Sequence, residues 1–188
     1  MVEEIKSLET MDVSGEDLLN MVKYKSNLLE YSDLHKYTNI EEVLGYYGCC
    51  IILYQTESEY EGHWTCIFKS NKNQRHLLFF DSYGLGIDTE LKYSEFNKSL
   101  HKGRIVSHLR QLISNSNYSV TSNHFKLQTN RIDITTCGRY VATRINNRDM
   151  SNRQYVRFIR GLTKELQTPP YKIDDPDYNT TLLSLTYF

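Results

Sequence analysis

Three strand-length segments in the middle of the chain constrain its fold more than any other feature. Cys49 to Tyr54 is a continuous apolar run, and His63 to Lys69 and His76 to Asp81 are two further strand candidates. The segment between the last two, Ser70-Asn-Lys-Asn-Gln-Arg, is polar and has the composition of a turn. The sequence therefore predicts a sheet in which the second and third of these strands pair as a hairpin.

Helical patterns lie on both sides of these strands. Helices are expected over 14–29, 38–44, 104–113, 137–146 and 152–166, and short strands at 118–120 and 124–127. Thr38 or Asn39 can cap the second helix, and Gly45 can end it. Pro169-Pro170 stops the last helix. Residues 1–13 carry no such pattern, so we expect them to be loosely ordered.

This order of elements predicts an α+β protein with a central mixed, mostly antiparallel sheet flanked by helices. The length of 188 residues fits one domain, with an N-terminal helical region (1–45), a core (46–166) and a C-terminal tail (167–188). Hydrophobic residues make up 39% of the chain, which is typical of a soluble globular protein. Because no apolar run approaches the length of a membrane span, we expect no membrane partner.

Charge is balanced over the whole chain but uneven along it. The net charge of −1 gives no support for non-specific nucleic-acid binding by the whole chain. An acidic tail follows a basic stretch, whose residues are Arg139, Arg144, Arg148, Arg153, Arg157, Arg160 and Lys164. This stretch is either a solvated helix face or a strip for nucleic acid or an acidic partner.

Three of the four cysteines have the surroundings of core residues. Cys49, Cys50 and Cys66 lie inside apolar strands, where cysteine packs as a small hydrophobic residue. The chain starts with Met-Val-Glu-Glu, which is not a secretory signal, so we expect reduced thiols and a protein that is not secreted. The spacing of His63 and Cys66 occurs in zinc sites, but no second ligand pair follows, and we expect no metal.

Cys137 differs because it lies where a polar segment changes to a helix-compatible one. Thr135 or Thr136 can cap this helix, which places the cysteine in a first turn that favours the thiolate, the nucleophilic form. Gly138 leaves room for a substrate and exposes backbone N–H groups. The backbone N–H of Cys137 and the side-chain amide of Gln128 are candidate donors to an oxyanion.

The predicted hairpin brings a histidine and a carboxylate together. If the hairpin is centred near Lys72, His63 lies opposite Asp81, with Cβ atoms about 5 Å apart. The carboxylate then accepts a hydrogen bond from one ring nitrogen and leaves the other free to act as a base. The alternative is an ordinary surface histidine and a turn aspartate.

Four short motifs occur in an order that resembles a known family; they are Gly62-His63-Trp64, Phe79-Phe-Asp-Ser-Tyr-Gly84, Gln128 and Thr136-Cys137-Gly138. The order is similar to that of the adenovirus-type (adenain-like) and Ulp/SENP-type cysteine proteases. The motifs look most like those of the maturation proteases of virophages, Polinton/Maverick elements and large DNA viruses. The resemblance covers residues 31–142 and implies a papain-like, adenain-like protease fold.

Carried over position by position, the resemblance gives each motif a role. Cys137 would be the nucleophile, His63 its base and Asp81 the residue that orients the base. Gln128 would be an oxyanion donor, and Trp64 would line the groove beside the histidine.

One departure from the family pattern concerns the oxyanion donor. The gap between Gln128 and Cys137 is longer than in the family, so Asn130 is an alternative donor. Asp133 would then order the loop.

The implied activity is that of a cysteine endopeptidase that processes capsid or other virion polypeptides, cleaving after a small residue such as Gly. The resemblance implies no cofactor and a location in the virion and the host-cell cytoplasm. Activation by a peptide or by DNA is a further expectation, which the basic stretch allows. A deconjugase of ubiquitin-like modifiers and a catalytically inactive capsid-associated scaffold are the alternatives.

Overall fold

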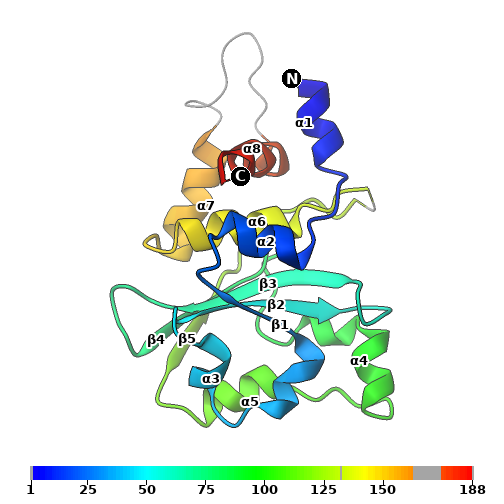
Figure 1. The fold of residues 1–188 in the computed structure, drawn as a ribbon, viewed down its shortest axis with the longest axis vertical. Helices are drawn as coiled ribbons and strands as arrows, with labels where there is room; N and C mark the ends of the chain where they lie inside the picture. Colours follow the sequence, from blue (N-terminus) through cyan, green and yellow to red (C-terminus); the bar gives the residue numbers. More distant parts are fainter. Residues whose placement is uncertain (1, 132, 163–174, 188) are drawn as a thin grey trace.

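The computed structural model describes residues 2–131, 133–162 and 175–187. Helices cover both faces of one open, five-stranded mixed sheet (Figure 1). The strands are β1 (Asn27–Glu30), β2 (Cys49–Gln55), β3 (Gly62–Lys69), β4 (His76–Phe80) and β5 (Ser119–Ser122). The helices are α1 (Val2–Leu8), α2 (Gly15–Met21), α3 (Ile40–Leu44), α4 (Glu95–Leu100), α5 (His108–Ser114), α6 (Cys137–Asn146), α7 (Asn152–Gly161) and α8 (Pro176–Ser184). Short 3₁₀ turns are η1 (Tyr31–Lys36), η2 (Glu90–Lys92) and η4 (Leu185–Tyr187).

The strands lie in the sheet in the order β1-β2-β3-β4-β5. The central pairs β2/β3 and β3/β4 are antiparallel, whereas both edge pairs, β1/β2 and β4/β5, are parallel. The sheet is therefore mixed, with as many parallel as antiparallel pairs. Every residue of β2 is buried, because helices cover both faces of this strand, and that explains its unbroken apolar sequence.

Alternate residues of the strands feed two separate cores. Phe80 packs with α2, α6 and α7 on one face of the sheet, while its neighbour Phe79 packs with η1, α3 and α5 on the other. Successive side chains of a strand point to opposite faces, so adjacent phenylalanines serve both cores. Figure 1 shows the two helical layers above and below the sheet.

Helix α6 lies at the centre of the first core, between the sheet and α8 (Figure 1). Its residues from 138 to 145 are all buried. The Arg144 guanidinium lies between the rings of Phe68 and Tyr155, 4.7 and 5.1 Å from their centroids. Arg139 is also buried and donates to Ser184 Oγ at 3.1 Å. Two arginines of the basic stretch thus belong to the interior and not to a surface strip.

The N-terminal part of the chain differs from the sequence prediction. Residues 2–8 form α1 where loose order was expected. The helix predicted over 14–29 ends at Met21, and Lys23 and Tyr24 adopt positive φ angles of 54°, which break the helix. The chain then turns into β1, whose apolar residues pair with β2 instead of continuing a helix.

Three further differences lie in the second half of the chain. Residues 124–127 do not form a strand, and α4 and α8 were not predicted. Helix α7 begins as predicted at Asn152 and ends at Gly161. The predicted continuation over 163–166 and the stop at Pro169-Pro170 lie outside the described residues.

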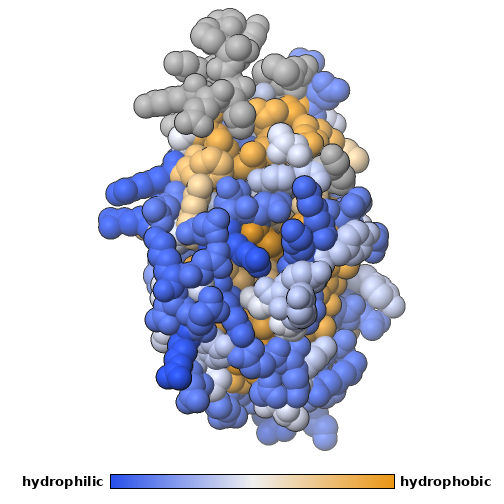
Figure 2. Space-filling model, turned by 60° about the vertical axis from the view of Figure 1, so that its left-hand side comes forward, coloured by the Kyte–Doolittle hydropathy of each residue, from blue (hydrophilic) through white to orange (hydrophobic). Residues whose placement is uncertain are grey.

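Helix α8 packs against α1, α6 and α7, so the described part of the tail belongs to the folded structure. On the face drawn in Figure 2, hydrophobic side chains gather at the upper end, the level at which α7 and α8 lie in Figure 1. The surface below them is mostly hydrophilic. In the described part of the chain, no helix has the length and apolar character needed to cross a bilayer.

Candidate active site

His63 lies at the start of β3, just beyond the part of that strand that pairs with β4. The predicted hairpin register would pair Cys66 with Leu78, but the structure pairs Cys66 with Phe80. Asp81 is therefore not directly opposite His63, and the predicted register is wrong by two residues. Because side chains alternate with a period of two, this displacement keeps both side chains on the same face, and His63 Nε2 lies 3.1 Å from Asp81 Oδ1.

Asp81 is fully buried and is held by contacts on its own loop. Its Oδ1 also accepts the backbone N–H of Tyr83 at 2.6 Å. The Tyr83 ring stacks on the His63 imidazole, with centroids 4.6 Å apart. These contacts fix the orientation of the carboxylate and of the ring.

Asn123, directly after β5, is a supporting residue that the sequence analysis missed. Its Oδ1 accepts the Asp81 backbone N–H at 2.8 Å, and its Nδ2 donates to the Asp81 carbonyl at 2.7 Å. Parallel pairing of β4 and β5 places this side chain beside the end of β4. No signal in the sequence shows this pairing.

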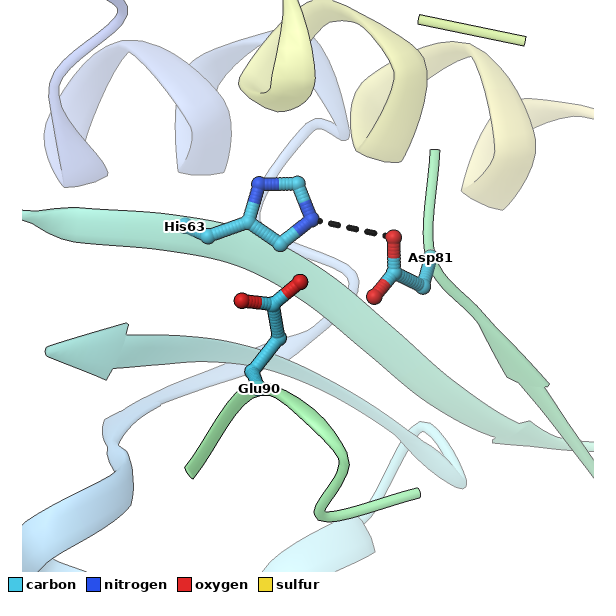
Figure 3. Close-up of side chains that lie close together, drawn as sticks. All are labelled: His63, Asp81 and Glu90. Carbon is cyan, nitrogen blue, oxygen red and sulfur yellow. Dashed lines mark hydrogen bonds and ion pairs between the residues drawn. The ribbon is translucent and has the colours of Figure 1, made fainter. Parts of the chain in front are cut away.

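Cys137 is the first residue of α6 and is half-buried. Burial by itself lowers the pKa of His63, but the Asp81 charge and hydrogen bond, followed by the hydrogen bond and charge of the Cys137 side chain, raise it well above its usual value. Figure 3 shows that Nε2 faces Asp81 and that the second ring nitrogen, Nδ1, points away from it. The site can hold an imidazolium between a carboxylate and a thiolate.

The other three thiols lack this setting. Cys49, Cys50 and Cys66 are fully buried in the strands, as predicted. Burial raises the pKa of Cys49 to about 11 and that of Cys50 and Cys66 well above the usual value. Buried thiols of this kind do not react as nucleophiles.

The two candidate oxyanion donors have different surroundings. Gln128 is buried; its Oε1 accepts the Ser82 hydroxyl at 2.6 Å, and its Nε2 donates to the Ile134 carbonyl at 3.3 Å. One hydrogen of that amide is left to donate elsewhere. Asn130 is exposed. Of the two candidates, Gln128 is therefore the one whose amide is held in place, through Ser82, beside Asp81.

The loop between Gln128 and Cys137 is held by Asp177 of α8, which the sequence analysis missed. Asp177 Oδ2 accepts the backbone N–H and the hydroxyl of Thr129 at 2.9 and 2.7 Å, and its Oδ1 accepts the Thr136 hydroxyl at 2.5 Å. Thr136 occupies the N-cap position of α6, but its side chain makes this bond instead of a capping bond. The segment Asp175-Pro-Asp is typical of a helix start, yet it does not indicate this partner.

The N-terminal region holds the same loop from its other side. The backbone N–H of Thr135 donates to the Glu9 carbonyl at 2.9 Å. Asp133, which was predicted to order the loop, pairs with Arg131 at 2.5 Å on the surface. The order of this loop thus comes from both ends of the chain.

A groove of about 550 Å³ leads to Cys137. Trp64 lines it and donates from Nε1 to the Val13 carbonyl at 3.2 Å. A Cβ on Gly138 would lie 3.1 Å from Val13, 3.3 Å from Leu18 and 3.4 Å from Trp64. The expectation that Gly138 leaves room for a substrate is therefore wrong. These side chains fill the space beside it.

The described residues thus define an α+β protein with a Cys–His–Asp cluster where β3 begins and β4 ends. The chain is 30% identical to a protein of Sputnik virophage, "Uncharacterized protein V9", over 169 residues that cover 90% of this chain and 95% of the virophage protein. It belongs to the family of this virophage protein. No protein-family model matches the chain.

Proposed function

We propose that the protein is a cysteine endopeptidase with the papain-like arrangement of the adenain and Ulp type. One observation carries the proposal. The His63 imidazole is hydrogen-bonded to the buried Asp81 at 3.1 Å. It also interacts with the side chain of Cys137, the first residue of a ten-residue helix. A thiolate, a base and an orienting carboxylate are the groups that acyl transfer by cysteine requires.

The reaction follows from these positions. His63 takes the thiol proton of Cys137, and the sulfur forms a bond to the carbon of the scissile carbonyl. The oxyanion accepts the backbone N–H of Cys137 and the remaining amide hydrogen of Gln128. The carbon–nitrogen bond then breaks as His63 gives its proton to the leaving amine. A water molecule, deprotonated by His63, attacks the thioester and releases the acid and the thiol.

The proposed substrates are capsid or other virion precursor polypeptides, cleaved after a small residue such as Gly in the virion or the host-cell cytoplasm. The relationship to a virophage protein supports this class of substrate. A preference for a small residue is supported by Trp64, a bulky side chain that lines the same groove as Cys137.

The test uses the full chain with purified virion polypeptides of the same virus, and mass spectrometry of the products. Wild type should release new termini after small residues, while Cys137→Ala should release none. Asp133→Asn, which removes an exposed carboxylate outside the cluster, is the control and should cleave like wild type. Cleavage by Cys137→Ala at the wild-type rate would refute the proposal. Cleavage only of ubiquitin-like fusions would favour the deconjugase.

Activation by DNA is a further part of the proposal. With Arg139 and Arg144 buried, Arg153 and Arg157 on α7 are exposed residues of the basic stretch that such a ligand would contact. Electrostatic binding of this kind weakens steeply with salt. Added duplex DNA should therefore raise the cleavage rate at low salt and lose this effect at high salt; a salt-independent rate would exclude it.

A further inference from the structure

A third acidic side chain, Glu90, approaches the His63–Asp81 pair from the η2 turn. One ligand atom from each of His63, Asp81 and Glu90 lies within 4.8 Å of the other two, and all three residues are buried. Figure 3 shows the Glu90 carboxylate below the imidazole ring, pointing toward it and toward Asp81. Glu90 comes from a loop that the sequence analysis did not connect with the site.

Two carboxylate oxygens in this cluster are buried without a partner. Among the described residues, Asp81 Oδ2 and Glu90 Oε1 make no hydrogen bond. Such atoms are rare in folded proteins and indicate a missing ligand or a shared proton. Asp88 shows the usual pattern, because it accepts the hydroxyls of Tyr31 and Tyr54 and the backbone N–H of Arg110.

The charges of the cluster also favour a cation. Asp81 and Glu90 face one imidazole, and within the described residues neither carboxylate forms an ion pair with a lysine or arginine. Two carboxylates in a buried site are costly without a cation to offset their charges. A divalent ion would offset the charges of both carboxylates at once.

We propose that His63, Asp81 and Glu90 form a binding site for a divalent transition-metal ion, of which Zn²⁺ is the best fit. One imidazole nitrogen and two carboxylate oxygens are ligands that zinc accepts, with a fourth position left to water. Ligand atoms of a tetrahedral zinc ion are about 3.4 Å apart. His63 Nε2 and Asp81 Oδ1 are already 3.1 Å apart, so a small movement of the Glu90 side chain completes the set.

An open cavity reaches the Glu90 side of the cluster. It has a volume of about 530 Å³, is separate from the groove at Cys137, and is lined by Tyr83, Leu85, Glu90, Tyr93, Lys126, Asn130 and Arg131. Asp133 pairs with Arg131 and offsets its charge. A cation can therefore approach Glu90 through a cavity that Cys137 does not line.

The consequence of binding, which rests on the proposed function, is reversible inhibition. A neutral imidazole that binds Zn²⁺ through Nε2 carries its single proton on Nδ1. The ring then has no lone pair with which to accept the thiol proton. The metal thus stops the reaction at the base and leaves the sulfur free.

The first test measures Zn²⁺ binding to full-length Cys137→Ala by competition with a chromophoric chelator. This variant should bind one ion, because the proposed site contains no sulfur. Glu90→Gln in the same background should bind at least about tenfold more weakly. Glu95→Gln, which removes an exposed carboxylate paired with Lys98, is the matched control and should bind like its parent.

The second measurement replaces zinc with Co²⁺ and records the absorption spectrum of wild type. Weak d–d bands without a thiolate charge-transfer band support nitrogen and oxygen ligands. A thiolate band, loss of binding in Cys137→Ala, or equal affinity with and without Glu90 would overturn the metal site. A shared proton between Asp81 and Glu90 would then explain the two oxygens.

These readouts do not depend on peptidase activity. If wild type cleaves no substrate but Cys137→Ala binds zinc through Glu90, the proposed function fails and the metal site stands. If wild type cleaves its substrate and neither variant binds zinc, only the metal site fails.

Discussion

His63 and Asp81 are held by strand pairing, whereas Cys137 is held by segments from both ends of the chain. Asp81 follows β4 directly, and Asn123 from the neighbouring strand β5 bonds to its backbone. The loop before Cys137 instead depends on Glu9 near the N-terminus and on Asp177 near the C-terminus.

This difference separates the assembly of the base from the assembly of the nucleophile. The base forms when the central sheet forms, because His63 lies in β3 and its supports directly follow β4 and β5. The nucleophile takes its place only when α8 has packed on α6 and α1 has packed on α8. Damage to the packing of the ends should therefore displace Cys137 and leave the His63–Asp81 pair intact.

The largest expected effect is on the nucleophile itself. Cys137→Ala should reduce peptide hydrolysis by about four to six orders of magnitude, because nothing else in the site can form the acyl intermediate. The free energy of unfolding should change little, because this side chain is half-buried at a helix end. Single-turnover kinetics and urea denaturation measure both. A loss of folding stability that accounts for the lost activity would contradict this prediction.

Removing the orienting carboxylate should have the next largest effect. Asp81→Asn should lower kcat by about three to four orders of magnitude, because the amide no longer stabilises the imidazolium. It should also lower the pKa of His63, since the Asp81 charge and hydrogen bond are what chiefly raise it. NMR titration of the imidazole measures this shift. An unchanged His63 pKa would show that the pair is not coupled.

The sequence predicted the His63–Asp81 pair but not Asn123, the residue that holds Asp81 in place. His63 and Asp81 were paired from a hairpin with the wrong register, and the pairing survived because the displacement was two residues and kept both on one face. Asn123 could not be predicted, because the contact depends on a parallel strand that follows a long crossover.

The nucleophile was predicted from local sequence, but its environment was not. The change from polar to helical residues placed Cys137 at the start of α6, as the structure shows. Asp177 lies 41 residues from Thr136 in sequence, and their contact depends on how α8 packs against α6. Glu90 reaches the site from a loop, and no periodic pattern places a loop residue.

Asp177→Asn tests the support of the nucleophile directly. The carboxylate has two acceptor oxygens, one for Thr129 and one for Thr136, whereas the amide has one oxygen and an NH₂ group that donates. One or more of these hydrogen bonds should therefore be lost, at a cost of about 1–3 kcal/mol. We expect kcat to fall about 10- to 100-fold with a smaller change in KM. The His63 pKa should stay the same.

Asp175→Asn is the matched control for this substitution. It removes the same charge from the same segment and keeps a residue that caps α8 well, without a contact to the loop. It should retain nearly full activity. Equal losses of kcat in both variants would mean that charge in the tail, and not the Asp177 contacts, supports the site.

The smallest expected effect is a pH dependence of stability caused by Glu9. Burial, and then the charges of Asp175 and Asp177, raise the pKa of Glu9 to about 7, although Lys6 and Arg131 lower it. The folded state thus binds more protons than the unfolded state between the usual pKa of 4.5 and about pH 7. The free energy of unfolding should decrease as the pH rises through this interval.

Glu9→Gln should remove this decrease, because the amide does not titrate and keeps the backbone carbonyl that Thr135 uses. The variant should match wild type near pH 4 and exceed it in stability at pH 8, as urea denaturation at several pH values can show. Glu3→Gln, on the exposed face of α1, should retain the wild-type slope. Because the Asp177 charge contributes to the raised pKa of Glu9, Asp177→Asn should weaken the slope without abolishing it. A slope that is the same in Asp177→Asn and in wild type would show that the two ends of the chain support the loop independently.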